Sequence, residues 1–158
     1  MPIYKYLDKT KSYRYANIMS FLEQYGLAED FRDMIVLDAV ILNLDRHLGN
    51  FGFIVDNDTF RIKRFAPLFE HNMALVAQGM AKTLREDTDY VKSLGHNIGA
   101  GFDFVTTAKG KWLTHRTKGI LHQLQDFSFI RHKTHNLSAK RLLFLNNLVH
   151  EQIKEILE

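Results

Sequence analysis

Asn-Leu-Asp-Arg-His-Leu-Gly-Asn, at residues 43–50, is the run that most constrains the fold of this chain. It is followed about twenty positions later by Ala-Pro-Leu-Phe-Glu at residues 66–70. Phosphoryl transfer needs one carboxylate beside the attacking hydroxyl and separate oxygen ligands for magnesium on the nucleotide phosphates. The two runs supply Asp45, Asn50 and Glu70 in chain order. They therefore predict a site of the phosphotransferase type.

The segments on either side of the first run have clear periodicities. Residues 28–42 read as a helix with Glu29 and Asp30 at its positive end, and its second half is apolar around nearly the whole circumference. Such a helix is expected to be central and buried, and it leads directly into residue 43. The following residues, 51–55 and 59–65, are short and rich in aromatic or β-branched side chains, and Asp-Asn-Asp between them favours a turn. They predict a small hairpin.

The rest of the chain is expected to be helical or irregular. One helix is predicted at residues 13–25, with Ser12 as its N-cap and Gly26 as its stop, and a second at 84–94, closed by Gly95. The patterns predict irregular chain at 66–82, a loop at 95–111 with a short helical turn near 102–105, and helices at 112–125 and from Ser138 to the end. The apolar face of the last helix is made by Leu142, Leu145, Val149, Ile153 and Ile156.

These elements define the expected fold class, which is mainly α with a small β-hairpin. At 158 residues we expect one domain over 1–158, with a motif-bearing core at about 28–76 and a helical remainder at 84–158. Asp38 lies inside the apolar helix, where a buried carboxylate needs a partner, and we expect a nearby Arg or His to pair with it.

Composition excludes several classes of protein. The chain has no cysteine, so disulfides, thiolate metal sites and cysteine catalysis are excluded. Its longest apolar stretch, 34–42, contains Asp38 and is far shorter than the roughly 20 residues that span a bilayer. The N-terminus lacks the apolar core of a signal peptide. We therefore expect a cytoplasmic protein without membrane contact, and the net charge of +3 permits acidic partners without requiring them.

Together the two runs resemble the C-terminal lobe of HipA-like serine/threonine kinases, best known as bacterial toxins paired with a DNA-binding antitoxin. The Asp-Arg-His-x-x-Asn core is more distantly similar to phosphoinositide 3- and 4-kinases. The likeness covers about residues 28–76, under a third of the chain, and its position after a buried helix and before a hairpin makes it specific. It implies a protein-kinase-like C-terminal lobe that works with ATP and Mg²⁺.

The resemblance also implies a role for each polar residue of the two runs. Asp45 falls on the family's catalytic base, which orients the acceptor hydroxyl and takes its proton. Asn50 and Glu70 fall on the two magnesium ligands, the second of which is normally an aspartate. The remaining polar residues are expected to brace the loop: Asn43, Arg46 and His47.

A complete kinase of this kind also has a glycine-rich cover over the phosphates and a strand lysine. Only 44 residues precede Asp45, and none of them reads as such a cover. We therefore expect no phosphate transfer by this chain alone. Three origins stay open: a split-kinase half completed by a separate protein that bears the N-terminal lobe, a degenerate relative kept as a binding module, or a piece of a longer chain. An apolar surface left exposed by the missing lobe could drive self-association.

Other interpretations of the same residues also stay open. Asp45 and Asn43 could serve only as turn formers and helix caps. The main alternative function is a nucleic-acid-binding module, because basic residues interleave with aromatic ones at 109–135. Its candidate residues are Lys109, Lys111, Arg116, Lys118, Arg131 and Lys133. A metal hydrolase has less support, because the eight histidines are scattered without a His-Glu-x-x-His motif.

Overall fold

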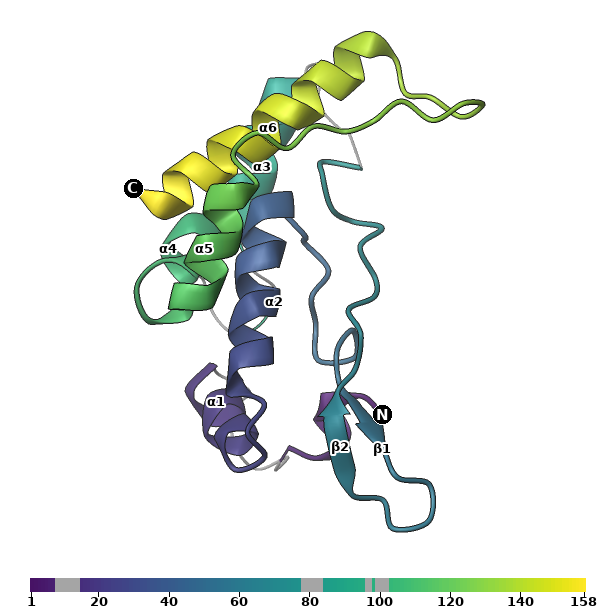
Figure 1. The fold of residues 1–158 in the computed structure, drawn as a ribbon, viewed down its shortest axis with the longest axis vertical. Coiled ribbons are helices and arrows are strands. Elements are labelled where there is room, and N and C mark those ends of the chain that lie inside the picture. The colour runs from purple at the N-terminus through teal and green to yellow at the C-terminus, as the bar shows by residue number, and fades with distance from the viewer. Residues whose placement is uncertain (8–14, 78–83, 96–97, 99–102) are drawn as a thin grey trace.

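The protein is mainly helical with one two-stranded antiparallel hairpin, as the sequence predicted. Figure 1 shows the fold in a computed structural model, which describes residues 1–7, 15–77, 84–95, 98 and 103–158. Helix α2 runs through the middle of the molecule, α6 crosses one end of it, and the hairpin lies near the other end (Figure 1). In the described part of the chain, every helix is too short or too polar to traverse a membrane.

Helix α2 (Ala28–Ile41) is the buried central helix that its apolar sequence predicts. It packs against α1 (Tyr15–Glu23), α4 (Phe104–Ala108) and α6 (Ala139–Leu157). It ends at Leu42, whose left-handed φ of 51° turns the chain out of the helix. The last carbonyls of a helix lack partners within it. Here the Asp38 carbonyl accepts from the amides of Leu42 and Asn43, that of Ala39 from the Gln152 side chain, and that of Ile41 from the Leu75 amide.

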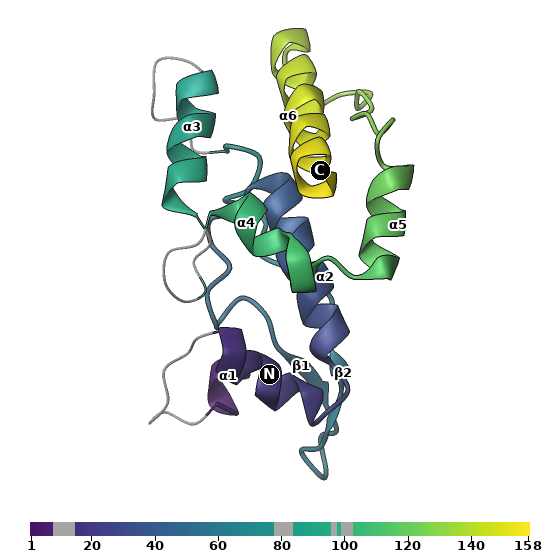
Figure 2. The same ribbon diagram turned by 90° about the vertical axis from the view of Figure 1, so that its left-hand side faces the viewer.

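Two apolar clusters share α2. The first surrounds its N-terminal half and contains side chains from α1, the hairpin and Trp112. The second surrounds its C-terminal half and contains side chains from α4, α5 (His115–Gln123) and α6. Figure 2 shows the same division, with α1 and the hairpin near one end of α2 and α3 (Leu84–Leu94), α4 and α6 near the other. The polar loop at residues 43–50 therefore follows Leu42 of the second cluster and leads to Phe51 of the first.

The hairpin pairs β1 (Phe53–Val55) with β2 (Ile62–Phe65), which are shorter strands than the sequence predicted. The pairing stops early because Asp56 holds the turn: its Oδ1 accepts hydrogen bonds from the amides of Asp58 and Thr59. On the other edge of β1, Met1 and Ile3 pair with residues 51–53, and a short 3₁₀ helix (Ile3–Lys5) follows. Gly52 permits this approach, because a Cβ there would lie 2.1 Å from the Met1 carbonyl oxygen.

Some of the remaining helices depart from the prediction and others agree with it. The helix expected at 112–125 is two elements, a 3₁₀ turn (Gly110–Trp112) and α5, because Leu113 is extended and Thr114 caps α5 by accepting from the Thr117 amide. The turn expected near 102–105 is α4, which Asp103 caps. The predicted N-cap Ser12 lies outside the described residues. Helix α3, Gly95 at its end and the Ser138 cap of α6 agree with the sequence, and on α6 Leu142 is only half-buried while Gln152 is fully buried.

Candidate functional site

The site begins with Arg46, a fully buried arginine just beyond the end of α2. Its Nε and Nη2 atoms donate to the two oxygens of Asp38, at 2.8 and 3.0 Å. This bidentate ion pair confirms the prediction that Asp38 pairs with a nearby Arg or His. A buried carboxylate is tolerated when it is paired in this way. Burial also raises the pKa of the Tyr15 phenol, and the charge of Asp38 raises it further against an opposing hydrogen bond from Thr107.

The same guanidinium joins the two sequence runs. Arg46 Nη1 donates to the Asn50 carbonyl and to the Phe69 carbonyl, both at 2.6 Å, and Nη2 lies 3.0 Å from Nε2 of His71. With the two bonds to Asp38, these contacts use the five N–H donors of a guanidinium. The loop at residues 43–50 (the motif loop) is thereby attached to residues 66–77 (the acidic loop). The bond to Phe69 falls next to Glu70.

Asn43 makes a second link between the two loops. Its Nδ2 donates to Asp38 Oδ1 at 3.0 Å and to the Glu70 carbonyl at 3.3 Å, and its Oδ1 accepts from the Asp45 amide at 3.3 Å. The side chain is fully buried. One carboxamide therefore contacts the main chain of both Asp45 and Glu70.

Asp45 and Asn50 lie in direct contact. Nδ2 of Asn50 donates to the Asp45 carbonyl at 2.7 Å and reaches Asp45 Oδ2 at 3.3 Å. The Asp45 side chain keeps 36% of its surface exposed, so its carboxylate is open to a substrate. A carboxylate accepts hydrogen bonds and cannot satisfy helix carbonyls. Asp45 is therefore not a C-cap of α2.

His47 is held beside Asp45 in one orientation. Its Nδ1 accepts from the Gly49 amide at 3.0 Å, which leaves the proton of the neutral ring on Nε2. Nε2 lies 3.8 Å from Asp45 Oδ1, beyond a hydrogen bond but close enough for an electrostatic contact. The ring is half-exposed, so water or a ligand can enter between the two groups.

Glu70 is an exposed residue of the acidic loop, and its backbone is left-handed with φ of 56°. Leu75 and Val76, in the same loop, have φ of 56° and 55°. Such conformations cost free energy in residues that carry a Cβ and persist only where the surroundings hold them. Here Arg141 of α6 supplies part of the restraint, with Nη2 donating to the carbonyls of Leu75 and Val76 at 3.0 and 2.7 Å.

Sequence reasoning missed two contacts, that of Arg141 with the acidic loop and that of His71 with Arg46. Arg141 contacts the acidic loop across more than sixty residues of sequence, and no local pattern marks such a contact. His71 follows Glu70 directly, and its proximity to Arg46 depends on the path of the acidic loop.

The contacts bring Asp45 and Asn50 together. The Asn43 side chain connects the Glu70 carbonyl to the Asp45 amide. The Glu70 carboxylate makes no hydrogen bond or ion pair among the described residues. Within the same residues, no three side chains of the His, Asp or Glu type cluster at metal-binding range. The candidate oxygen donors are the carboxylates of Asp45 and Glu70 and the carboxamide of Asn50. Oxygen donors of this kind suit Mg²⁺.

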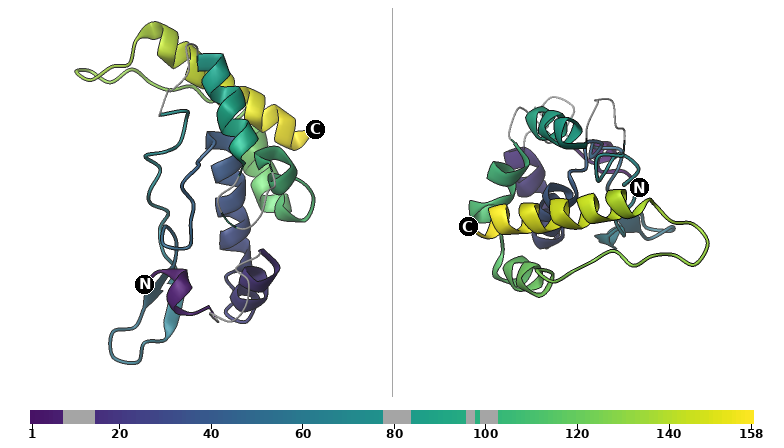
Figure 3. Two further views of the ribbon diagram at one scale, coloured as in Figure 1. Left: turned by 180° about the vertical axis from the view of Figure 1, so that it is seen from behind. Right: turned by 90° about the horizontal axis from the view of Figure 1, so that it is seen from above.

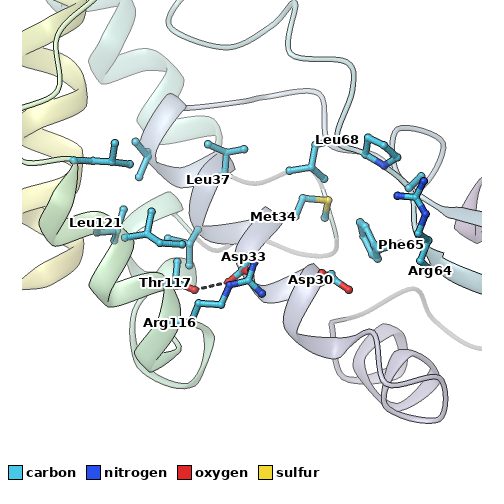
Figure 4. Close-up of a pocket in the computed structure, with 16 residues that line it drawn as sticks. Asp30, Asp33, Met34, Leu37, Arg64, Phe65, Leu68, Arg116, Thr117 and Leu121 are labelled. Carbon is cyan, nitrogen blue, oxygen red and sulfur yellow. Dashed lines mark hydrogen bonds and ion pairs between the residues drawn. The ribbon is translucent and has the colours of Figure 1, made fainter.

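A separate apolar groove of about 430 Å³ lies between α2, α5 and residues 64–68 (Figure 4). Leu37 and Met34 of α2, Leu121 of α5 and Leu68 point into it (Figure 4). Its lining includes Ala-Pro-Leu of the second sequence run but none of Asp45, Asn50 and Glu70. The largely apolar groove and the polar site therefore use different residues of the acidic loop, 66–68 for the groove and 69–71 for the polar site.

The basic residues proposed for nucleic-acid binding lie in different environments. Arg116 pairs with Asp33 at 3.3 Å in the lining of the groove, and Lys118 is exposed on α5. Trp112 is buried against Tyr15 and Phe31, so its ring is not available to stack on a base. The other candidates are Lys109, which is half-buried, Lys111, whose side chain lies outside the described residues, and Arg131 and Lys133, both exposed between α5 and α6.

Comparisons with models of protein families, with curated proteins and with solved structures found no match for this chain.

Proposed function

We propose that this chain is a kinase-like C-terminal lobe of the HipA-like type, with a magnesium-nucleotide site formed by the motif loop and the acidic loop. In this proposal Asp45 is the base, and Asn50 and Glu70 are metal ligands. Arg46, Asn43 and His47 hold or flank them. The protein acts in the cytoplasm on a serine or threonine of another protein, once a nucleotide-binding lobe completes the cleft.

The observation that carries the proposal is the set of buried contacts between the two loops. Arg46 donates to carbonyls of both loops at 2.6 Å, and Asn43 reaches the Glu70 carbonyl and the Asp45 amide. A helix cap or a simple turn does not require a fully buried guanidinium whose five donors span two loops. Such a connection supports a role in fixing Asp45, Asn50 and the Glu70 main chain relative to one another.

The residues of the chain have distinct tasks in the proposed reaction. The exposed Asp45 carboxylate accepts a hydrogen bond from the acceptor hydroxyl, orients it and takes its proton. The Asn50 amide, bonded to the Asp45 carbonyl and near its carboxylate, limits rotation of that acid. The Asn50 carbonyl oxygen and the Glu70 carboxylate are the groups that would hold Mg²⁺. When bound, Mg²⁺ would neutralise charge on the phosphates.

The sequence of this chain contains no glycine-rich phosphate cover, so the proposal assigns that part to another protein or to another part of a longer chain. Glu70 also differs from aspartate by one methylene group. A displacement of about 1 Å can cost on the order of a hundredfold in rate. We therefore expect magnesium-nucleotide binding by the isolated chain to be weak and phosphate transfer to be absent.

The test is thermal unfolding of the 158-residue chain with ATP, with and without Mg²⁺. At ten times the dissociation constant a ligand stabilises by about 1.4 kcal/mol, which raises the unfolding temperature by about 3–6 °C for a domain of this size. We expect Mg²⁺ to be required for the shift. Asn50→Leu should abolish it, because a leucine provides no oxygen ligand.

Glu70→Asp and the matched exposed control Glu29→Asp separate the metal site from general effects of shortening an acid. We expect the first to change the shift and the second to leave it unchanged. No shift with millimolar Mg-ATP in wild type and Glu70→Asp would contradict the proposal. An equal shift in Asn50→Leu would contradict the assigned ligands.

A further inference from the structure

The segment between α5 and α6 carries both positive charge and exposed apolar surface. From Phe127 to His150 the chain contains no Asp or Glu, while Arg131, Lys133 and Lys140 are exposed. Ile130 has 92% of its surface exposed, the largest value among the exposed large hydrophobic side chains described. Residues 127–137 are called the basic segment below. Figures 1 and 3 show that this part of the chain projects away from the helices.

The basic segment is held at its base. The Phe129 amide donates to Asn146 Oδ1 at 2.8 Å, and His150 Nε2 donates to the Phe127 carbonyl at 2.5 Å. Asn146 and His150 belong to α6, so the segment leaves the molecule from a fixed position. Ile130 comes directly after this anchor, and an apolar side chain in this place would contact water unless something covers it.

The outer part of the segment has its own hydrogen bonds. His132 Nδ1 accepts from the amides of Thr134 and His135, each at 3.2 Å, and Asn136 donates to the His132 carbonyl. The rings of His132 and His135 stack with centroids 5.6 Å apart. Neither Arg131 nor Lys133 forms an ion pair within the described residues, so their charges remain available to an anionic partner.

The arrangement of the aromatic rings distinguishes between the two anionic surfaces that could attract these charges. Binding of single-stranded nucleic acid uses exposed aromatic faces on which bases stack. Phe127 and Phe129 instead pack edge to face, 5.0 Å apart at 84°, and the most exposed apolar side chain is aliphatic. An aliphatic group flanked by cations suits an anionic bilayer, where the apolar group enters the interface and the cations meet the headgroups.

We infer that the basic segment is a docking surface for anionic lipid bilayers, with Ile130 entering the interface and Arg131 and Lys133 contacting lipid headgroups. The inference revises the expectation of no membrane contact. It involves no spanning helix and does not depend on the proposed nucleotide site. Because one aliphatic side chain and two or three cations are involved, binding is weak, reversible and sensitive to salt.

The test is sedimentation of the full 158-residue chain with phosphatidylcholine vesicles that contain 0 or 30% phosphatidylserine. We expect binding only to the anionic vesicles, with loss as salt rises. Ile130→Ser should weaken binding about tenfold or more. The double variant Arg131→Gln/Lys133→Gln should weaken it by at least about tenfold.

Matched controls lie elsewhere on the surface. Phe60→Ser removes a side chain that is 68% exposed on the hairpin, and Arg61→Gln/Lys118→Gln removes the same charge as the double variant. Both should bind as wild type does. Ile130→Trp should give a blue-shifted fluorescence on anionic vesicles, while Phe60→Trp should not, and the buried Trp112 provides a constant background in each.

Three results would overturn the inference. The first is no binding to anionic vesicles at low salt by folded wild-type protein. The second is equal loss of binding in the Phe60 and Ile130 variants. The third is tighter binding to a single-stranded oligonucleotide than to the vesicles, with that binding lost in the Arg131/Lys133 variant. This result would assign the segment to nucleic acid.

Discussion

The motif loop and the basic segment are both irregular connections rich in Arg, His and Asn, but they differ in burial and in hydrogen bonding. In the motif loop the arginine is fully buried and its donors bind side chains and carbonyls of several segments. In the basic segment Arg131 is exposed and the hydrogen bonds are mostly local. Composition therefore does not separate a loop that organises a site from one that faces a partner. What separates them is whether another element covers the charge.

The largest difference between the two regions is expected when one arginine is removed from each. Arg46→Ala leaves the Asp38 carboxylate buried without its cation, and removing one partner of a buried pair costs about 3–5 kcal/mol. Arg131→Ala should change the free energy of unfolding by less than about 0.5 kcal/mol. Urea denaturation of both variants measures the difference, and similar values for the two would contradict the structure.

A second comparison uses two neighbours on α6. Arg141→Ala removes the donors to the Leu75 and Val76 carbonyls, and hydrogen bonds from charged groups contribute about 1.5–3 kcal/mol. Lys140→Ala, at the adjacent exposed position, should have little effect. The same urea measurements apply. A larger effect of the lysine variant would show that Arg141 does not hold the acidic loop.

Asn146→Ala tests how the base of the basic segment is held. It removes one hydrogen bond to the Phe129 amide, for a loss of about 1 kcal/mol. Trypsin should then cut after Arg131 and Lys133 faster than in wild type, because the segment opens more often. Asn147→Ala, one residue further and exposed, is the control, and equal cleavage rates in all three proteins would contradict the anchoring role.

The smallest effect is expected in a third loop, the hairpin turn. Hydrogen bonding to Lys63 and to Thr59 lowers the pKa of Asp56 from 3.8 to about 2. A carboxyl whose pKa is lower in the folded state stabilises the protein above pH 3.8, and this contribution is lost as the pH falls towards 2. Asp56→Asn should therefore be less stable than wild type at pH 5, with a smaller difference at pH 3. Urea midpoints at both pH values test this, and an equal difference between the two proteins at pH 5 and pH 3 would contradict it.

Much of the fold could be predicted from local patterns. The apolar residues of α2 predict a buried helix, Gly95 and Ser138 predict the ends of α3 and α6, and the turn residues predict the hairpin. The prediction of a single helix over 112–125 was wrong. Apolar spacing continues across Leu113, and the Thr114 cap competes with helix propagation there only because its hydroxyl accepts from the Thr117 amide.

The candidate site was predictable in part. The spacing of Asp45 and Asn50 within one loop brings them together through local bonds, and that spacing is visible in the sequence. The approach of the acidic loop was expected only through the resemblance. Its position depends on Arg46, Asn43 and Arg141, whose partners lie 23 to 66 residues away along the chain. The catalytic role of Asp45 and the metal-binding roles of Asn50 and Glu70 stay predictions.

The order of residues determines local features here. These are which segments become helices, where a polar loop follows a buried helix, and that Asp38 needs a cation as its partner. Local rules suffice for these features because hydrogen bonding and side-chain periodicity act within a few residues. The joining of two loops by one buried guanidinium and the exposure of Ile130 are set by packing. Both depend on which elements cover a side chain, and burial is a property of the assembled molecule.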